Sequence, residues 1–160
     1  FRHSPEAGGF DIKVTSPLSP VTTALDKGAI RQALINLLSN AAKYSVSNND
    51  HRIEVELRTE GHNAVIEVRD FGIGIADEDQ LSIFLPFHRS MNDEIQAKGG
   101  TGLGLAIVRE FARGHGGEIT LESSLGEGSV FKLHLPMIEE ISIEDNEVAN
   151  GAYLGHRGRA

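Results

Sequence analysis

The sequence predicts an α/β fold, a two-layer sandwich in which about three helices cover one mixed, mostly antiparallel sheet. Five short segments alternate apolar and polar residues as half-buried strands do, and three others show the spacing typical of helices. One helix falls between the first two strands, a strand pair follows, and two helices precede a last strand pair. A doubly wound fold would alternate strand and helix throughout, so this order favours the sandwich.

The predicted strands are stretches of regular alternation, such as RIEVELR at 52–58. Along the chain they cover residues 10–15, 52–58, 64–69, 118–123 and 129–135. The predicted helices cover residues 27–44, 77–83 and about 102–114. Asp26 has the residue type of an N-cap for the first helix, and Gly114 and Gly116 close the last.

The composition fits one ordinary domain and a tail, because 160 residues leave no room for a multidomain protein. Asp and Glu (23) outnumber Lys and Arg (15), and the net charge of −8 argues against nucleic acid or an anionic membrane surface as partner. The absence of cysteine excludes a disulfide scaffold and suits a cytoplasmic location. No apolar run is long enough to span a bilayer, so we expect no direct membrane contact.

Three regions are expected along the chain. Residues 1–9 are predicted to be an N-terminal remnant or linker, 10–136 the folded domain, and 137–160 an acidic linker or tail. The chain opens at Phe1 rather than at a methionine, so we expect it to be a piece of a longer protein.

The first block that carries chemistry is RQALINLLSNAAKYS at 31–45, in the first predicted helix. At about 100° per residue, Asn36, Asn40 and Lys43 share one stripe. An apolar stripe faces nearly the opposite way and consists of Leu34, Leu37, Leu38 and Ala41. Carboxamide oxygens can bind a hard cation, and amide and ammonium N–H groups can bind phosphate oxygens. A solvated polar face would explain the same stripe, so both interpretations stay open on this block alone.

The second block is DFGIGI at 70–75, directly after the predicted strand 64–69. Asp70 places a carboxylate at the strand end, and Gly72 and Gly74 allow close approach of the backbone. Such a carboxylate could accept a hydrogen bond from an exocyclic amine such as that of adenine. The protein-kinase meaning of Asp-Phe-Gly fails, because the chain has no VAIK, HRD or APE element, and no Gly-Lys pair supports a P-loop.

The third block is KGGTGLGLAIV at 98–108. A glycine-rich turn that leads into a helix presents unpaired backbone N–H groups and the positive end of the helix dipole to an anion. Lys98 adds a charge and Thr101 a hydroxyl. The block therefore predicts a phosphate site.

Together and in this order, the blocks resemble the ATP-binding catalytic domain of bacterial sensor histidine kinases, part of the superfamily of gyrase, heat-shock chaperone and mismatch-repair ATPases. NLLSNAAKYS is similar to the family's asparagine motif, DFGIGI to its first glycine motif, FLPFHR (84–89) to its phenylalanine motif and GGTGLGL to its second glycine motif. The resemblance runs from about Phe10 to Pro136 and implies the histidine-kinase ATPase fold, with ATP and magnesium as cofactors. Phe84 and Phe87 would anchor a lid, unless they simply fill the core.

The resemblance also implies roles for individual residues around an ATP pocket between the asparagine helix and a mobile lid at about 85–101. Asp70 would bind the adenine amine, and Asn40 would be the magnesium ligand, helped by Asn36. Arg89 would lean toward the γ-phosphate and, with Asn36, act as a catalytic residue. The other nucleotide contacts it implies are Lys43, Tyr44, Gly72, Gly74, Ile75, Lys98, Gly100, Thr101, Gly102, Leu103 and Gly104.

One position separates transfer from hydrolysis. Hydrolysing relatives carry a water-activating glutamate four residues before the asparagine, where this chain has Asn36, and an amide cannot take a proton at neutral pH. The resemblance therefore favours transfer of the γ-phosphoryl group to a histidine. The alternatives are a module that binds ATP without transferring it and a hydrolysing ATPase of the same superfamily.

The expected partner lies outside this chain. None of the seven histidines is followed by an acidic residue, as the family's acceptor histidine is. We therefore expect the acceptor on a separate dimerisation domain of the parent protein, with a response regulator receiving the group afterwards. The fragment should be monomeric and the parent a homodimer, whether or not the parent is anchored in a membrane.

Overall fold

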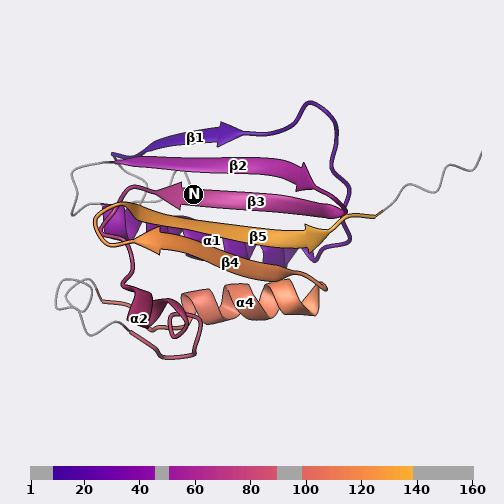
Figure 1. The fold of residues 1–160 in the computed structure, drawn as a ribbon. Coiled ribbons are helices and arrows are strands. Elements are labelled where there is room, and N and C mark those ends of the chain that lie inside the picture. Colours follow the sequence, from indigo (N-terminus) through magenta and orange to yellow (C-terminus); the bar gives the residue numbers. More distant parts are fainter. Residues whose placement is uncertain (1–8, 46–50, 90–98, 139–160) are drawn as a thin grey trace, which may run out of the picture.

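The computed structural model describes residues 9–45, 51–89 and 99–138, which form a five-stranded sheet with helices packed against one face (Figure 1). The strands are β1 (Asp11–Thr15), β2 (Arg52–Glu60), β3 (Asn63–Asp70), β4 (Glu118–Ser124) and β5 (Gly128–Pro136). The helices of these ranges are α1 (Lys27–Ser45), α2 (Asp77–Gln80) and α4 (Gly104–Gly114). The predicted α/β sandwich is confirmed.

The sheet has the strand order β1-β2-β3-β5-β4. β1 and β2 run parallel and α1 connects them, whereas each of the other neighbouring pairs is antiparallel. The late hairpin of β4 and β5 joins the early strands through β3, so that Asp70 stands opposite Ser129. This pairing brings residues that are far apart in sequence to the same end of the sheet.

α1 begins where the sequence predicts. Oδ1 of Asp26 accepts a hydrogen bond from the Ala29 N–H at 2.6 Å, as an N-cap does. The buried face of the helix is shifted from the predicted stripe, because Leu34 and Leu38 are only half-buried. Its fully buried apolar residues are Ala33, Leu37, Ala41 and Ala42. Small side chains on this face let the helix approach its neighbours closely.

Two helices are shorter than the sequence predicts. α4 begins at Gly104 rather than at 102, because Gly102 has a φ of +69°, which a right-handed helix cannot contain. α2 covers Asp77–Gln80 instead of 77–83. Beyond it the chain continues as separate turns, in which the Ser82 N–H donates to the Asp79 carbonyl at 2.8 Å.

The core lies between the helices and one face of the sheet. Its largest fully buried side chains are Leu37, Ile53, Val68, Val108, Leu133 and Leu135. After β5 the chain pairs with the segment before α1, where the Ile138 N–H donates to the Thr22 carbonyl at 2.9 Å. Most of 1–9 and 137–160 lies outside the described residues, so the limits of the domain stay a prediction. Within the described ranges, no helix combines the length and the apolar character that crossing a bilayer requires.

Candidate functional site

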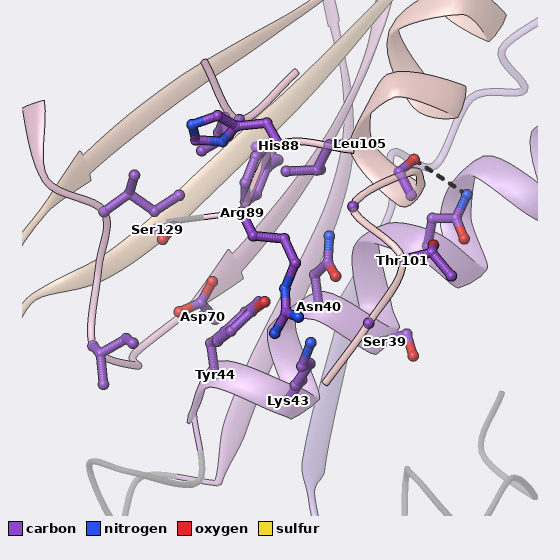
Figure 2. Close-up of a pocket in the computed structure, with 18 of the residues that line it drawn as sticks. Ser39, Asn40, Lys43, Tyr44, Asp70, His88, Arg89, Thr101, Leu105 and Ser129 are labelled. Atoms are coloured by element: carbon purple, nitrogen blue, oxygen red, sulfur yellow. Dashed lines mark hydrogen bonds between the residues drawn. The ribbon is translucent and has the colours of Figure 1, made fainter. Parts of the chain in front are cut away.

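A cavity of about 400 Å³ opens beside the end of β3 and the start of β5 (Figure 2). Its walls come from α1, the loop after β3, the turns after α2 and the start of α4. The lining residues are Asn36, Ser39, Asn40, Lys43, Tyr44, Asp70, Ile73, Gly74, Ile75, Ile83, His88, Arg89, Gly99, Gly100, Thr101, Gly102, Gly104, Leu105, Ser129 and Phe131. The three sequence blocks therefore meet at one cavity.

The α1 wall consists of polar side chains from one helix face. Asn36, Asn40 and Lys43 line the cavity together, as their helical spacing predicts, and Ser39 joins them. All four are half-buried. These four side chains are therefore only partly exposed to solvent, and they line the cavity beside other polar residues.

Asn36 joins two elements across the cavity. Its Nδ2 donates to the carbonyl oxygen of Gly104 at 3.3 Å, and its Oδ1 accepts from Gln32 Nε2 at 3.3 Å. The first bond, drawn as a dashed line in Figure 2, links α1 to the start of α4. Hydrogen bonds to both the oxygen and the nitrogen thus fix the orientation of the Asn36 amide.

Two basic side chains, Lys43 and Arg89, line the cavity. Nζ of Lys43 donates to the carbonyl oxygen of Gly99 and lies 4.9 Å from the centre of the Tyr44 ring. Arg89 extends its side chain into the cavity toward Tyr44 and Lys43 (Figure 2). Two cations beside a glycine-rich turn produce a local positive potential that favours phosphate oxygens.

Asp70 is the buried acid of the site, only 5% exposed at the end of β3. One of its carboxylate oxygens, Oδ1, accepts a hydrogen bond from the Gly72 N–H at 2.9 Å, and the Ser129 backbone supplies another bond to the carboxylate. Burial raises the pKa of Asp70 from its ordinary 3.8 to about 6, and the two hydrogen bonds, which favour the charged form, only partly offset the burial. Such a shift beside a cavity is typical of a functional carboxylate.

Glycines let the loop after β3 touch two neighbouring elements. A Cβ atom on Gly72 would lie 2.4 Å from the Tyr44 carbonyl oxygen near the end of α1. Gly74 has a φ of +69°, and its Cβ would lie 1.9 Å from the Ser124 carbonyl oxygen at the end of β4. Only glycine fits at these two positions, so the loop is held against both elements by close backbone contact.

The glycine-rich turn before α4 presents its backbone to the cavity. Gly100 and Gly102 have φ values of +123° and +69°. The carbonyl oxygen of Gly102 accepts a hydrogen bond from the Phe87 N–H at 2.9 Å, which ties this turn to the segment before it. Leu103, at the N-cap position of α4, makes no side-chain cap, so the first amides of α4 suit an anion.

The phenylalanine motif divides between core and surface. Phe84 packs edge-on against Phe131, with ring centres 6.4 Å apart. Phe87 is 74% exposed and has a positive φ of 63°. Phe84 therefore has the core role that the sequence left open, whereas Phe87 does not.

Three of the predicted site residues are not among those that line the cavity. Gly72 faces the backbone of α1, and Leu103 lines a separate groove beside Ile107 of α4. Lys98 and most of the expected lid at 85–101 lie outside the described residues. The roles assigned to these residues stay predictions.

Sequence reasoning also missed residues that line the cavity. They are Ser39, Ile73, Ile83, His88, Gly99, Leu105, Ser129 and Phe131. Ser129 and Phe131 reach the cavity because β5 pairs with β3, which periodicity does not reveal. Ser39 could have been found, since it lies three residues after Asn36 on the same helix face.

The donor set fits a hard cation that is held mainly by phosphates. Asn40 brings an amide oxygen to the cavity. Among the described residues, no cluster of three or more His, Cys, Asp or Glu side chains could hold a metal ion. Mg²⁺ commonly keeps several waters and binds through one or two protein oxygens plus substrate phosphates, so an amide beside a phosphate site is compatible with it.

Comparison with known families agrees with this geometry. A family model described as "Histidine kinase-, DNA gyrase B-, and HSP90-like ATPase" matches residues 25–139, which include all three sequence blocks. The chain belongs to this family of ATP-binding ATPase domains.

The curated relatives specify a narrower group. Sensor-like histidine kinase SenX3 of Mycolicibacterium smegmatis is 41% identical over 136 residues, which cover 84% of this chain and 35% of SenX3. Histidine protein kinase DivJ of Caulobacter vibrioides is 34% identical over 135 residues, which cover 83% of this chain and 22% of DivJ. The chain thus spans about a third or less of the length of these sensor kinases.

Solved structures show the same fold. The mycobacterial sensor histidine kinase MprB has a TM-score of 0.66 and 29% identity, over 80% of this chain and 82% of that one. Full-length ShkA in complex with AMPPNP has a TM-score of 0.66 and 28% identity, over 81% of this chain and 26% of ShkA. The predicted histidine-kinase ATPase fold is confirmed.

Proposed function

We propose that this chain is the catalytic domain of a sensor histidine kinase, which binds Mg-ATP and transfers the γ-phosphoryl group to a histidine on a separate dimerisation domain of its parent protein. The observation that carries the proposal is one cavity that joins a buried carboxylate, an amide-bearing helix face and a glycine-rich helix start. The sensor kinases among its relatives support the same assignment.

The base end of the cavity suits adenine. Asp70 would accept a hydrogen bond from the exocyclic amine, since its carboxylate is buried and faces the cavity. Gly74 and Ile75 would form the wall beside the ring, and Tyr44 would pack nearby. Gly72 would contribute indirectly: because it has no Cβ atom, the loop after β3 can lie close against α1.

The other end suits the phosphates. Lys43 and Arg89 supply charge, and we assign the same role to Lys98. The backbone from Gly100 to Gly104, including Thr101, Gly102 and Leu103, would donate N–H groups to phosphate oxygens at the start of α4. With this division, the γ-phosphoryl group would lie near Arg89 and the asparagine face of α1.

Magnesium would enter with the nucleotide. Asn40 would be its protein ligand, with Asn36 beside it. When bound, the ion neutralises charge that develops on the phosphate oxygens. The residues of this chain would orient the nucleotide, and the donors at the start of α4 would hold the γ-phosphoryl group in line for attack.

Transfer fits the site better than hydrolysis. Asn36 occupies the place of the water-activating glutamate, and its amide is engaged with Gly104 and Gln32 rather than acting as a base. In transfer, an imidazole nitrogen of the acceptor forms a bond to phosphorus, the bond from phosphorus to the β–γ bridging oxygen breaks, and ADP leaves. The imidazole proton passes to the acidic residue beside the acceptor histidine. A response regulator would receive the phosphoryl group next, and the parent would dimerise through the acceptor domain.

The test mixes this chain, Mg-ATP and the separately purified dimerisation domain of the parent. We expect acid-labile, base-stable phosphate on the dimerisation domain, no label on this chain, and little phosphate release by this chain alone. The matched control replaces the acceptor histidine of the dimerisation domain with Gln.

Two outcomes would contradict the proposal. Rapid phosphate release by the chain alone would favour a hydrolysing ATPase. ATP binding without label on the dimerisation domain, at high concentrations of both proteins, would favour a module that binds ATP without transferring it.

A further inference from the structure

Side-chain hydrogen bonds join the loop after β3 to β4 and α2 at the backbone of Ile75. The Ile75 N–H donates to Ser123 Oγ at 2.9 Å, and the Ile75 carbonyl oxygen accepts from Gln80 Nε2 at 3.2 Å. Ile75 lines the cavity, whereas Ser123 and Gln80 are not among its lining residues. Two side chains behind the wall therefore hold the backbone of a residue that forms it.

The Ser123 hydroxyl connects several parts of the base end. Besides the Ile75 N–H, it lies 2.7 Å from the Gly128 carbonyl oxygen and 3.1 Å from Ser129 Oγ. A hydroxyl has one proton and two acceptor lone pairs. Ser123 can therefore donate to Gly128 while it accepts from Ile75 and Ser129. Ser129 stands opposite Asp70 in the sheet. The Ser123 hydroxyl therefore connects the loop residue Ile75 with the strand that lies beside Asp70.

Gln80 fixes α2 to the same structure. Its Nε2 also lies 3.1 Å from the Ser123 carbonyl oxygen and 3.1 Å from Asp77 Oδ1. α2 has only four residues, so its own backbone bonds cannot fix its position. Ser123 and Gln80 thus hold Ile75 from two elements, and we call this pair the Ile75 bracket.

The rest of the loop follows the turn between β4 and β5. The Gly126 N–H donates to the Ile73 carbonyl oxygen at 2.8 Å, and Gly74 touches the Ser124 backbone closely. Ile73, Gly74 and Ile75 all line the cavity. A displacement of this turn would therefore move three successive wall residues together.

We infer that Ser123 and Gln80 are positioning residues of the base end, which act through Ile75 to hold the wall against the adenine ring. The inference rests on the proposed function, because it assigns the base to this end of the cavity. Neither side chain lines the cavity, and both bond the backbone of Ile75, so their loss should weaken base recognition and leave phosphate contacts intact.

The experiment measures the affinity of the chain for Mg-ATP and for Mg-tripolyphosphate, which lacks the base. We expect Ser123→Ala and Gln80→Met each to weaken ATP binding by about fivefold to tenfold, and to change tripolyphosphate binding by less than about twofold. Ser123→Thr, which keeps the hydroxyl, should restore most of the ATP affinity. Thr120→Val is the matched control on β4, because the Thr120 hydroxyl bonds His134 at 3.1 Å, away from the loop.

Amide hydrogen exchange of the ligand-free protein provides a second measurement. The Ile75 amide should exchange faster in Ser123→Ala and be unchanged in Thr120→Val. If Ser123→Ala folds poorly, Gln80→Met still tests the inference, because it leaves the hydroxyl in place. Unchanged ATP affinity in both variants, or equal losses for both ligands, would overturn the inference. If the unaltered chain does not bind ATP, the proposed function itself fails.

Discussion

Replacing Asp70 by Asn should stabilise the ligand-free protein at neutral pH while it weakens ATP binding. Asp70 is 5% exposed, and burial raises its pKa from 3.8 to about 6 despite hydrogen bonds from the Gly72 and Ser129 backbone. At neutral pH the empty site therefore holds a charge that the surrounding protein disfavours. A neutral side chain of nearly the same shape removes that penalty.

The size of the effect follows from the pKa difference. A rise of about 2 pH units corresponds to about 3 kcal/mol, at about 1.4 kcal/mol per unit. Because the folded-state pKa is the higher one, the stability from this group is fully present below pH 3.8 and is lost as the pH rises through about 6. Asn has one acceptor oxygen where the carboxylate has two, which costs about 1 kcal/mol. We expect a net gain of about 1–2 kcal/mol in the free energy of unfolding at neutral pH.

The assay is urea unfolding of the unaltered chain and of Asp70→Asn, without nucleotide, at about pH 7.5 and about pH 3. The stability gain should be present at the higher pH and absent at the lower one, where Asp70 is largely neutral in both the folded and unfolded states. The same variant should bind ATP at least about fivefold more weakly at neutral pH, because a charged acceptor is lost. A variant that is less stable at both pH values, or a gain that does not change with pH, would refute the reasoning.

Other substitutions separate the remaining parts of the site. Asn40→Ala should weaken ATP binding by about tenfold in the presence of Mg²⁺ but barely in EDTA, as measured by calorimetric titration, and equal losses in both would exclude the metal role. Gly102→Ala should lower the free energy of unfolding by more than about 1 kcal/mol, because Gly102 combines a φ of +69° with a backbone atom 2.7 Å from the added Cβ. Gly99→Ala is its control, since Gly99 has a similar φ of +67° and open space around its Cβ, and equal losses would show that steric contact contributes nothing. His115→Ala should lower the free energy of unfolding, measured with urea, by about 1–2 kcal/mol, because His115 Nε2 accepts the Asp26 N–H at 3.2 Å. This bond is remote from the cavity, so the affinity for ATP should not change, and a loss of affinity would contradict this prediction.

The elements of the fold could be predicted because their signals are local. Alternation located all five strands within two residues of their observed ends, and the Asp26 cap marked the start of α1. The start of α4 was misplaced because the left-handed conformation of Gly102 depends on its contact with the turn at Phe87, far back in the sequence. The pairing of β3 with β5 is likewise a long-range choice that a period of two residues cannot report.

The same contrast between local signals and long-range contacts applies to the residues of the site. Asn36, Asn40 and Lys43 were recognised as one surface because a helix fixes their relative directions. Ser129 was missed because it meets Asp70 only through the β3–β5 register. Ser123 and Gln80 carry no motif at all, and their connection to Ile75 appears only when β4, α2 and the loop are assembled.

Under the proposed function, Asp70 would explain why the end of the cavity assigned to the base has so much supporting structure. In the empty site its charge is disfavoured, yet the charged carboxylate is the better acceptor for an adenine amine. Binding of adenine would therefore recover free energy that the ligand-free fold gives up. This requires the exocyclic amine to come within hydrogen-bond distance of the carboxylate, where it takes the place of the water that burial removed. That proximity depends on the wall formed by Ile73, Gly74 and Ile75, which the β4–β5 turn and the Ile75 bracket hold in place. A loose wall would leave the carboxylate buried and uncompensated, so under the proposed function the hydrogen bonds that hold the loop and the burial of the acid would serve the same recognition of the base.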